Sequence, residues 1–276
     1  MAALSIGSKV KLNNGVEIPR FGLGVWQTPS GPTTQRAVTA ALEAGYRLID
    51  TAKMYGNEAD VGQAVRESGI PRDDVFITTK LWNSDHGYEP ALKAGEGSVK
   101  RIGFPSVDLY LIHWPVSGLR KDTWRAMERL LKDGKARAIG VSNYMIPHLE
   151  ELLATSKVVP AVNQVELSPF LFSKDLVEFC KKHGIAVEAY SPLTKGHRLG
   201  DERLKTLAAK YRKTVPQLLI RWGLQHGIIE IPKSARPEHI RENARVFDFE
   251  IRGEDMRALD SMGEDLHMAW DPTDEP

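Results

Sequence analysis

Short apolar runs alternate with amphipathic stretches along almost the whole chain. Eight runs have the length and composition of buried strands: FGLGVW, YRLID, DVFITTK, VDLYLIH, ARAIGVSN, AVNQVEL, AVEAYSPL and IIEIPKS. The stretches between them have helical spacing, as in NEADVGQAVRESG, where Asn57 is a candidate cap and Gly69 a stop. Strands that alternate with helices in about eight units predict an α/β fold, a closed (β/α)8 TIM barrel.

Three local patterns refine this prediction. The segment KVKLNNGVEIP alternates around Asn14-Gly15 and predicts an N-terminal β-hairpin that forms a lid or plug before the barrel. In TTQRAVTAALEAG, Thr33 is the predicted cap and Gly45 the stop. KAGEGSVKR carries two glycines that each cost a helix interior about 1 kcal/mol, which argues against a continuous third helix.

Length and charge limit the possible functions. The chain has 276 residues, 42% of them hydrophobic, and neither a linker nor a low-complexity run, so we expect one barrel domain over residues 1–276. Its 37 basic and 36 acidic residues leave no broad footprint for nucleic acid or an anionic membrane. The single cysteine, Cys180, and the absence of a long apolar run predict a soluble protein of a reducing cytoplasm with a small-molecule partner.

Polar side chains recur where the predicted strands end. Because parallel strands of a barrel all end on one face, residues far apart in sequence are expected to meet there around one pocket. The residues at these ends are Asp50, Lys80, His113, Asn143, Gln164, Glu166, Tyr190, Lys233 and Ser234.

Three of these side chains have chemistry that complements that of a nearby tyrosine, Tyr55. Tyr55 is a poor acid at its usual pKa near 10, but an adjacent Lys80 is expected to lower that pKa by about 1 to 3 units. Asp50 is the predicted counter-ion of the lysine, and His113 the group that holds a substrate oxygen against the tyrosine. The set suits protonation of a carbonyl oxygen. It offers no nucleophile for acyl transfer, and the histidines show no spacing for a metal site.

A carbonyl reduction also needs a hydride, which none of these side chains supplies, so a nicotinamide cofactor is implied. Asn143 and Gln164 suit its carboxamide, and Tyr190 its ring. The loop after the last strand carries Lys233, Ser234 and Arg236 where barrels commonly bind phosphate, which favours NADPH. GLGVWQ lacks the third glycine of a Rossmann fingerprint.

The chain resembles the aldo-keto reductases from end to end, through FGLGVWQ, LIDTAKMYGNE, ITTKLWN, DLYLIHWP, IGVSN, NQVE, YSPL and IPKS followed by REN. The resemblance implies a barrel that reduces aldehydes and ketones with NADPH, with Tyr55 as general acid, Lys80 and Asp50 as its tuning pair, and His113 as the orienting group. It also implies a monomer. The compact PVSGLRKDTW resembles the prokaryotic branch with diketogluconate and glyoxal or methylglyoxal reductases. The implied cofactor-binding residues are Gly24, Val25, Ser142, Asn143, Gln164, Tyr190, Ser191, Leu193, Lys233, Ser234, Arg236, His239, Glu242 and Asn243.

One departure from the family pattern concerns the cofactor. His239 stands where many members carry an arginine that pairs with the 2′-phosphate, so some NADH use is expected beside NADPH.

Other aromatic, acidic and histidine side chains are divided by position. The tryptophans that follow strands one, three and four are predicted to form the walls of the substrate pocket: Trp26, Trp82 and Trp114. The tryptophans within helical stretches are predicted to pack in the core: Trp124 and Trp222. Glu166 and Glu188 are interpreted as structural groups of the barrel wall, and three histidines as surface or cap residues: His86, His148 and His183.

Three other functions remain open on the sequence alone. A glycosidase would use two carboxylates, for which Asp50 and Glu166 are available. An aldolase would use Lys80 or Lys233 as a Schiff base. A nucleotide-binding regulatory protein on the same fold would bind the cofactor without turnover.

Overall fold

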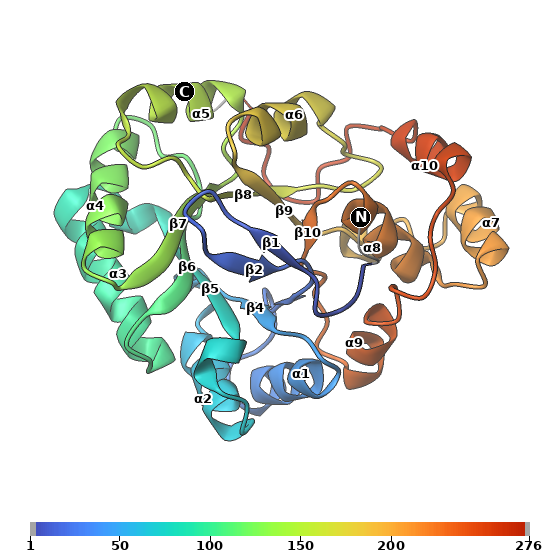
Figure 1. Ribbon diagram of the computed structural model, residues 1–276, viewed down its shortest axis with the longest axis horizontal. Helices are drawn as coiled ribbons and strands as arrows, with labels where there is room; N and C mark the ends of the chain where they lie inside the picture. The colour runs from blue at the N-terminus through green and yellow to red at the C-terminus, as the bar shows by residue number, and fades with distance from the viewer. Residues whose placement is uncertain (1–3, 274–276) are drawn as a thin grey trace.

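The computed structural model describes residues 4–273 and contains a closed (β/α)8 barrel, as the sequence predicts (Figure 1). Its strands are β3 (Leu23–Gly24), β4 (Leu48–Asp50), β5 (Phe76–Leu81), β6 (Val107–Ile112), β7 (Ala136–Ser142), β8 (Val162–Glu166), β9 (Ala186–Tyr190) and β10 (Ile229–Glu230). Each strand pairs in parallel with the next along the chain, from β3 to β10. Parallel bridges from Phe21 to Glu230 and from Gly24 to Lys233 join the first strand to the last and close the barrel.

Alternate residues of each strand face the inside of the barrel. Leu48 packs in a cluster inside the barrel, whereas the next residue, Ile49, packs in the larger cluster that includes the surrounding helices. The following residue, Asp50, again faces inward. The inner cluster is apolar: Leu12, Ile18, Leu48, Phe76, Leu109, Leu111, Ala138, Ala161, Val162, Ile229 and Ile231. Polar inward positions therefore occur mainly near the carboxyl ends of the strands.

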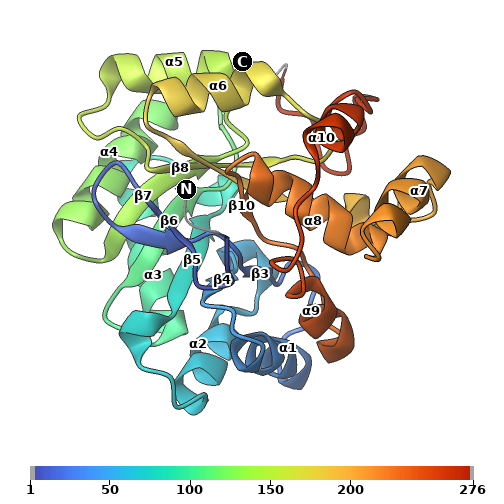
Figure 2. The same cartoon turned by 45° about the vertical axis from the view of Figure 1, so that its right-hand side comes forward.

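Helices surround the barrel (Figures 1 and 2). They are α1 (Pro32–Glu43), α2 (Glu58–Glu67), α3 (Tyr88–Ile102), α4 (Arg120–Lys132), α5 (Ile146–Thr155), α6 (Lys174–Lys182), α7 (Glu202–Lys210), α8 (Val215–Gln225), α9 (Pro237–Asn243) and α10 (Gly253–Asp260). Both α7 and α8 lie between β9 and β10 in the chain, and α9 and α10 follow β10. None of the described helices is long and apolar enough to cross a bilayer.

The argument against a continuous third helix is wrong. Helix α3 runs unbroken through Gly95 and Gly97. A Cβ at Gly95 would lie 2.5 Å from Leu130 Cδ1 on α4 and 3.3 Å from Tyr110 Cε1 on β6, so the missing side chain lets the helix pack closely. This tertiary packing outweighs the low helix propensity of glycine.

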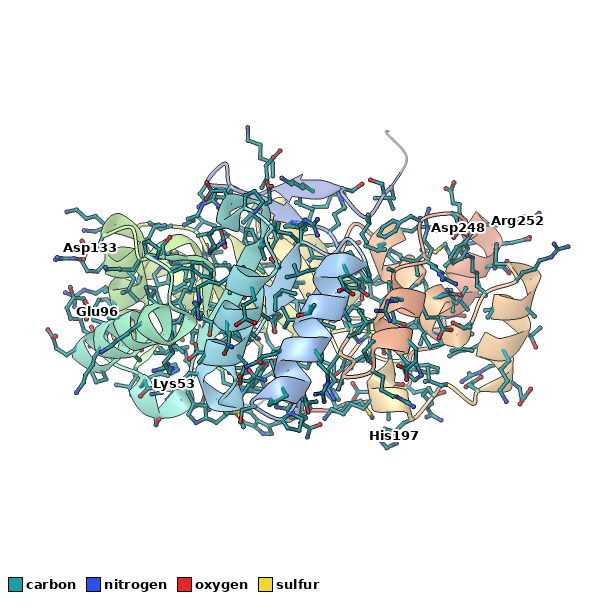
Figure 3. The ribbon with its side chains drawn as sticks, turned by 90° about the horizontal axis from the view of Figure 1, so that it is seen from below. Lys53, Glu96, Asp133, His197, Asp248 and Arg252 are labelled. Carbon is teal, nitrogen blue, oxygen red and sulfur yellow. The ribbon has the colours of Figure 1, made fainter. Side chains whose placement is uncertain are left out.

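The N-terminal hairpin closes the end of the barrel opposite the carboxyl ends of the strands. It consists of β1 (Lys9–Lys11) and β2 (Glu17–Pro19), joined through Asn14-Gly15 as predicted. Leu12 and Ile18 reach from it into the inner cluster, so the hairpin is the predicted plug. In Figure 3 the hairpin lies at the top, and Lys53 and His197, in the loops after β4 and β9, lie at the opposite end.

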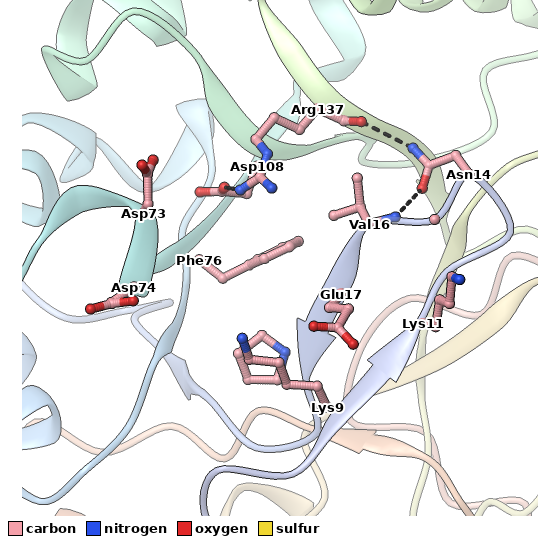
Figure 4. A pocket seen from close by; sticks show the side chains of 12 residues that line it. Lys9, Lys11, Asn14, Val16, Glu17, Asp73, Asp74, Phe76, Asp108 and Arg137 are labelled. Atoms are coloured by element: carbon pink, nitrogen blue, oxygen red, sulfur yellow. Dashed lines mark hydrogen bonds and ion pairs between the residues drawn. The ribbon is translucent and has the colours of Figure 1, made fainter.

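A hollow of about 610 Å³ lies beside this hairpin (Figure 4). Its buried carboxylate, Asp108, is held by Arg137 at 2.7 Å, by Arg72 at 2.7 Å and by the backbone N–H of Ile77 at 2.9 Å. Asn14 donates to the carbonyl of Arg137 at 3.0 Å. These bonds tie the hairpin and the strand ends at this face to one another.

Two predicted helix caps differ in detail. Asn57 precedes α2, but its side chain makes no cap bond; it donates to the carbonyls of Val25 and Thr28 and accepts from Thr51. Helix α1 begins at Pro32, so Gly31 rather than Thr33 is the cap residue. The side chain of Asn57 therefore fixes the loop after β3 against the loop after β4, where Tyr55 lies.

Most predictions for the remaining side chains are confirmed. Trp124 and Trp222 are buried in the core, where their indole N–H groups donate to the Val158 carbonyl and to Asp260. His183 lies exposed at the end of α6, and His148 caps α5 through the Met145 N–H. Of the two alternatives for His86, surface or cap, the structure shows the second: it is the C-cap residue of the 3-10 helix Asn83–Asp85, its ring is buried beside Thr123, and burial lowers its pKa to about 4.

Candidate active site

A pocket of about 780 Å³ opens at the carboxyl ends of the strands. Strand ends and the loops that follow β3, β4, β5, β6, β9 and β10 supply its walls, together with the segment near residue 270. Most of the predicted site residues line it: Gly24, Trp26, Asp50, Tyr55, Trp82, His113, Trp114, Ser142, Asn143, Gln164, Tyr190, Ser191, Leu193, Lys233, Ser234, Arg236 and His239. The predicted site residues therefore lie together on one face of the barrel, as expected for the ends of parallel strands.

Lys80 joins the predicted quartet at the floor of this pocket. Its buried ammonium group donates to Asp50 Oδ1 at 2.6 Å, to the Thr51 carbonyl at 3.0 Å and to the Tyr55 hydroxyl at 3.3 Å. Burial alone would lower the pKa of Lys80, but Asp50 and Tyr55 outweigh it and leave that pKa raised. Lys80 therefore stays charged, and two of its contacts, Asp50 and Tyr55, line the pocket.

The predicted fall in the pKa of Tyr55 is wrong for the chain alone. Burial raises this pKa to about 12, and Lys80 offsets only part of that rise, while Asp50 and Glu188 add to it. Sequence reasoning weighed the neighbouring cation but had no measure of burial. The phenol is therefore fully protonated at neutral pH, with a cation in contact that would stabilise a negative charge on its oxygen.

His113 lies beside Tyr55, with its ring centroid 5.7 Å from the tyrosine ring in an edge-to-face arrangement. Burial, and then the charge of Lys80, hold the pKa of His113 well below its usual value. The imidazole is therefore neutral and has one N–H to donate. Its Nδ1 has no partner among the described residues, and the ring lines the pocket.

Two amides occupy the next strand ends. Asn143 donates to the His113 carbonyl at 2.9 Å and accepts from the Tyr190 hydroxyl at 2.8 Å. Gln164 donates from Nε2 to Asp50 at 2.9 Å and to Glu188 at 2.6 Å. Because both amide nitrogens are engaged, the remaining capacity of these side chains lies on their oxygens, which accept hydrogen bonds. A carboxamide NH2 group is the ligand chemistry that matches.

The loop after β10 and helix α9 bring two cationic side chains and an imidazole to the pocket. Lys233, Arg236 and His239 line it, and none of their side chains has a hydrogen-bond or ion-pair partner among the described residues. Ser234 accepts the Arg236 N–H at 3.1 Å, which shapes the loop after β10. Partial burial lowers the pKa of Lys233. Side-chain donors without partners, two of them cationic, suit an anionic group such as phosphate.

Backbone strain also gathers at this pocket. Among residues 4–273, the non-glycine residues with positive φ are Gln27, Asn143, Ser191, Thr194, Lys195, Arg212 and Asp265. Four of these line the pocket: Gln27, Asn143, Ser191 and Lys195. Left-handed backbone costs free energy in residues with a side chain and persists where the surroundings impose it, so its concentration here marks a functional site.

Comparison with known proteins agrees with this geometry. Residues 20–264 match the model of the Aldo/keto reductase family. The chain belongs to the aldo/keto reductase family. It is similar to a glyoxal reductase of Bacillus subtilis, with 50% identity over 97% of each chain. Among solved structures it resembles an aldo/keto reductase of Brucella melitensis, with a TM-score of 0.89 and 49% identity over 92% of this chain and 99% of the other.

A second solved structure is an aldo-keto reductase of Bombyx mori in complex with NADP. It has a TM-score of 0.89 and 35% identity, over 96% of this chain and 95% of that one. As a member of the aldo/keto reductase family, the protein is an oxidoreductase.

Three cofactor residues implied by the resemblance do not line the pocket of this aldo/keto reductase. Val25 is buried, and its backbone N–H is bonded to the Asp50 carbonyl at 3.0 Å. Glu242 and Asn243 lie in the last turn of α9, where the Glu242 carbonyl accepts from Gln217. Lys80, from the predicted catalytic set, is also outside the lining, since it is buried behind Tyr55.

Sequence reasoning missed a wall of the pocket. Trp270 packs on Trp114 with ring centroids 5.1 Å apart, and Lys195 lies 4.5 Å from the centre of the Trp26 ring. Both line the pocket. Lys195 also donates to the Met268 carbonyl, which links the loop after β9 to this segment. The sequence feature that could have indicated this wall is Trp270, an isolated tryptophan in a polar segment.

The same segment is anchored by Glu166. Its carboxylate accepts from the backbone N–H groups of Met268 and Ala269 at 2.9 to 3.0 Å. The structural interpretation of Glu166 therefore fits its position, although the residue supports the pocket wall rather than the barrel alone.

Proposed function

We propose that the protein reduces aldehydes and ketones to alcohols with NADPH. The observation that carries this proposal is the contact of Lys80 with both Asp50 and the Tyr55 hydroxyl at the floor of an aromatic pocket. These groups suit the protonation of an oxygen on which negative charge develops. NADPH, when bound, supplies the hydride that reaches the carbonyl carbon.

Tyr55 is the proposed general acid. Its proton passes to the carbonyl oxygen, and the phenolate that remains lies 3.3 Å from the ammonium group of Lys80. Lys80 thereby stabilises the charge that forms, and Asp50 keeps Lys80 charged in its buried position. Such stabilisation acts more strongly on the transition state than on the neutral phenol, as catalysis requires.

His113 is the proposed orienting group. Its neutral imidazole lines the pocket beside Tyr55 and donates a hydrogen bond to the same carbonyl oxygen. Two donors then hold one oxygen, which fixes the face that the carbonyl carbon presents for hydride addition.

The chain's residues also fit the cofactor. The oxygens of Asn143 and Gln164 would accept from the carboxamide, and Tyr190 would pack on the ring. Lys233 and Arg236 would bind the phosphate that distinguishes NADPH from NADH. His239 offers a weaker partner than an arginine, so we expect some NADH use.

The substrates are expected to be small dicarbonyls, aldehydes or keto sugars. Trp26, Trp82, Trp114 and Trp270 give an apolar wall, while Tyr55 and the imidazole give a polar floor. Similarity to a glyoxal reductase supports small dicarbonyls as the first compounds to test.

Two other barrel activities fit the geometry less well. In a glycosidase, Asp50 and Glu166 would flank a sugar bond, but the first is paired with Lys80 and the second holds the backbone near residue 268. In an aldolase, Lys80 would need to be a free amine, but its ammonium donates three hydrogen bonds and its pKa is raised. Lys233 also lines the pocket, and borohydride trapping with a carbonyl substrate would reveal a Schiff base on it.

The test is the loss of nicotinamide absorbance with purified protein, NADPH or NADH, and a panel from methylglyoxal and phenylglyoxal to diketogluconate and simple ketones. We expect turnover of at least one dicarbonyl and a higher kcat/KM with NADPH than with NADH. Binding of NADPH without turnover of any carbonyl would instead favour a nucleotide-binding regulatory protein.

A further inference from the structure

Two neighbouring strands each bury a glutamate, one on either side of the barrel wall. Glu188 on β9 faces inward, and Glu230 on β10 faces outward against α8, where Gly223 leaves room for its carboxyl group. Both side chains are fully buried. Buried carboxyl groups without a cation in contact are costly when charged, so each is expected to have a function or to be neutral.

Glu188 is connected to the proposed catalytic group. The Nε2 atom of Gln164 donates one hydrogen bond to Glu188 Oε1 at 2.6 Å and the other to Asp50 Oδ2 at 2.9 Å. The opposite oxygen of Asp50 accepts from Lys80. One amide therefore holds two carboxyl groups close together, and the chain of contacts continues through Lys80 to the Tyr55 hydroxyl.

The surroundings of Glu188 favour a proton on it at neutral pH. Burial, and then the charge of Asp50, raise its pKa to about 8, against the opposing effects of Lys80 and Gln164. Its Oε2 has no partner among the described residues. The other titratable groups that interact with it are Tyr55 on the pocket side and Glu230 across the wall.

We propose that Glu188 is a positioning residue of the reaction, which controls the charge around Asp50, Lys80 and Tyr55 through the shared amide of Gln164. It touches neither the pocket nor a substrate. The proposal rests on the proposed reductase function, because its activity readout needs turnover.

The direction of the effect follows from charge. Above about pH 8 Glu188 is ionised, and a second negative charge beside Asp50 raises the pKa of Tyr55. Alcohol oxidation, the reverse reaction, needs the phenolate, so its rate rises with pH. Ionisation of Glu188 opposes that rise. The logarithm of the oxidation rate should therefore flatten partly, that is, rise less steeply, across a window near pH 8 and regain its slope at higher pH.

The matched experiment compares Glu188→Gln with Glu230→Gln in alcohol oxidation with NADP⁺. The Glu188→Gln variant keeps an acceptor for Gln164 but cannot ionise, so its profile should rise without flattening. Its rate should equal that of the wild type at about pH 6.5 and exceed it by about 3- to 10-fold at about pH 9.5, which corresponds to a shift of about 0.5 to 1 pH unit in the pKa of Tyr55. The Glu230→Gln variant should follow the wild type throughout.

Two results would overturn the proposal. One is a wild-type profile with no flattening between about pH 7 and 9, which needs no variant to fold. The other is an equal change in both variants, which would indicate a general effect of replacing a buried carboxyl group.

A readout independent of turnover is the infrared band of protonated carboxyl groups. We expect the wild type to lose one component of this band near pH 8, and Glu188→Gln to lack that component. If no carbonyl or alcohol is turned over but the band behaves as expected, the reductase function fails while the titration of Glu188 stands. If turnover occurs and the band does not change near pH 8, this inference alone is wrong.

Discussion

The two ends of the barrel each bury a carboxylate, but these carboxylates lie in different networks. At the hairpin end, Asp108 is held by Arg72, Arg137 and a backbone N–H, and every contact joins one part of the scaffold to another. At the pocket end, Asp50 holds Lys80, which also contacts the Tyr55 hydroxyl. The first network joins Asp108 to arginines and backbone groups of the scaffold, and the second reaches the Tyr55 hydroxyl in a pocket walled by aromatic side chains. The groups that contact a buried ion pair therefore indicate whether its role is structural or chemical.

Replacement of Tyr55 by phenylalanine should have the largest effect. Without the hydroxyl, nothing at the pocket end of the Asp50–Lys80 pair can protonate the substrate, so kcat should fall by about 10³-fold or more. NADPH affinity, measured by quenching of tryptophan fluorescence, should change less than about twofold, because the phenol acts on the oxyanion and not on the cofactor. A variant that keeps most of its kcat would remove Tyr55 from the catalytic role.

Replacement of Asp108 by asparagine tests the hairpin end in the same way. The change removes a charge from a buried acceptor of two arginines, both partly exposed, and should lower the free energy of unfolding by about 1 to 2 kcal/mol. Urea denaturation measures this, and kcat of the folded protein should be unchanged. A large fall in kcat would show that the two networks are coupled through the barrel.

Lysines at the two ends provide a further contrast. Lys233→Ala removes an unpaired cation from the pocket and should raise KM for NADPH by about 10-fold, with little change for NADH. The matched control, Lys11→Ala on the hairpin, should change neither value. An equal rise for both cofactors would place Lys233 away from the distinguishing phosphate.

The smallest expected effect comes from His239→Arg. A permanent charge at this position should improve the preference for NADPH over NADH by about 3- to 10-fold in kcat/KM. Unchanged preference would mean that residue 239 lies outside the reach of the phosphate.

The strands and the positions of the proposed catalytic residues were predictable because they depend on local patterns and one rule of topology. Apolar runs such as VDLYLIH predict buried strands, and parallel strands end on one face, which brings His113 to Lys80. Val25, Glu242 and Asn243 do not line the pocket, and their implied contacts with the cofactor stay predictions, since membership of a motif does not say which way a residue faces.

Features that depend on packing between distant segments were not predictable. The pKa of Tyr55 depends on burial, which only the folded chain provides. Helix α3 tolerates Gly95 because Leu130 approaches it closely. Trp270 lines the pocket on a segment whose backbone is bonded by Glu166 and Lys195, which lie far earlier in the sequence.

The bonds from Glu166 hold this segment in place without involving the side chains that line the pocket. Glu166 binds the N–H groups of Met268 and Ala269, which every residue except proline carries, so the attachment does not depend on the side chains there. Substitutions at 269 and 270 can thus reshape this wall of the pocket, where we propose that substrates bind, while its point of attachment stays the same. New substrate ranges can evolve, or be engineered, by exchange of a few residues in this segment, without repacking the barrel.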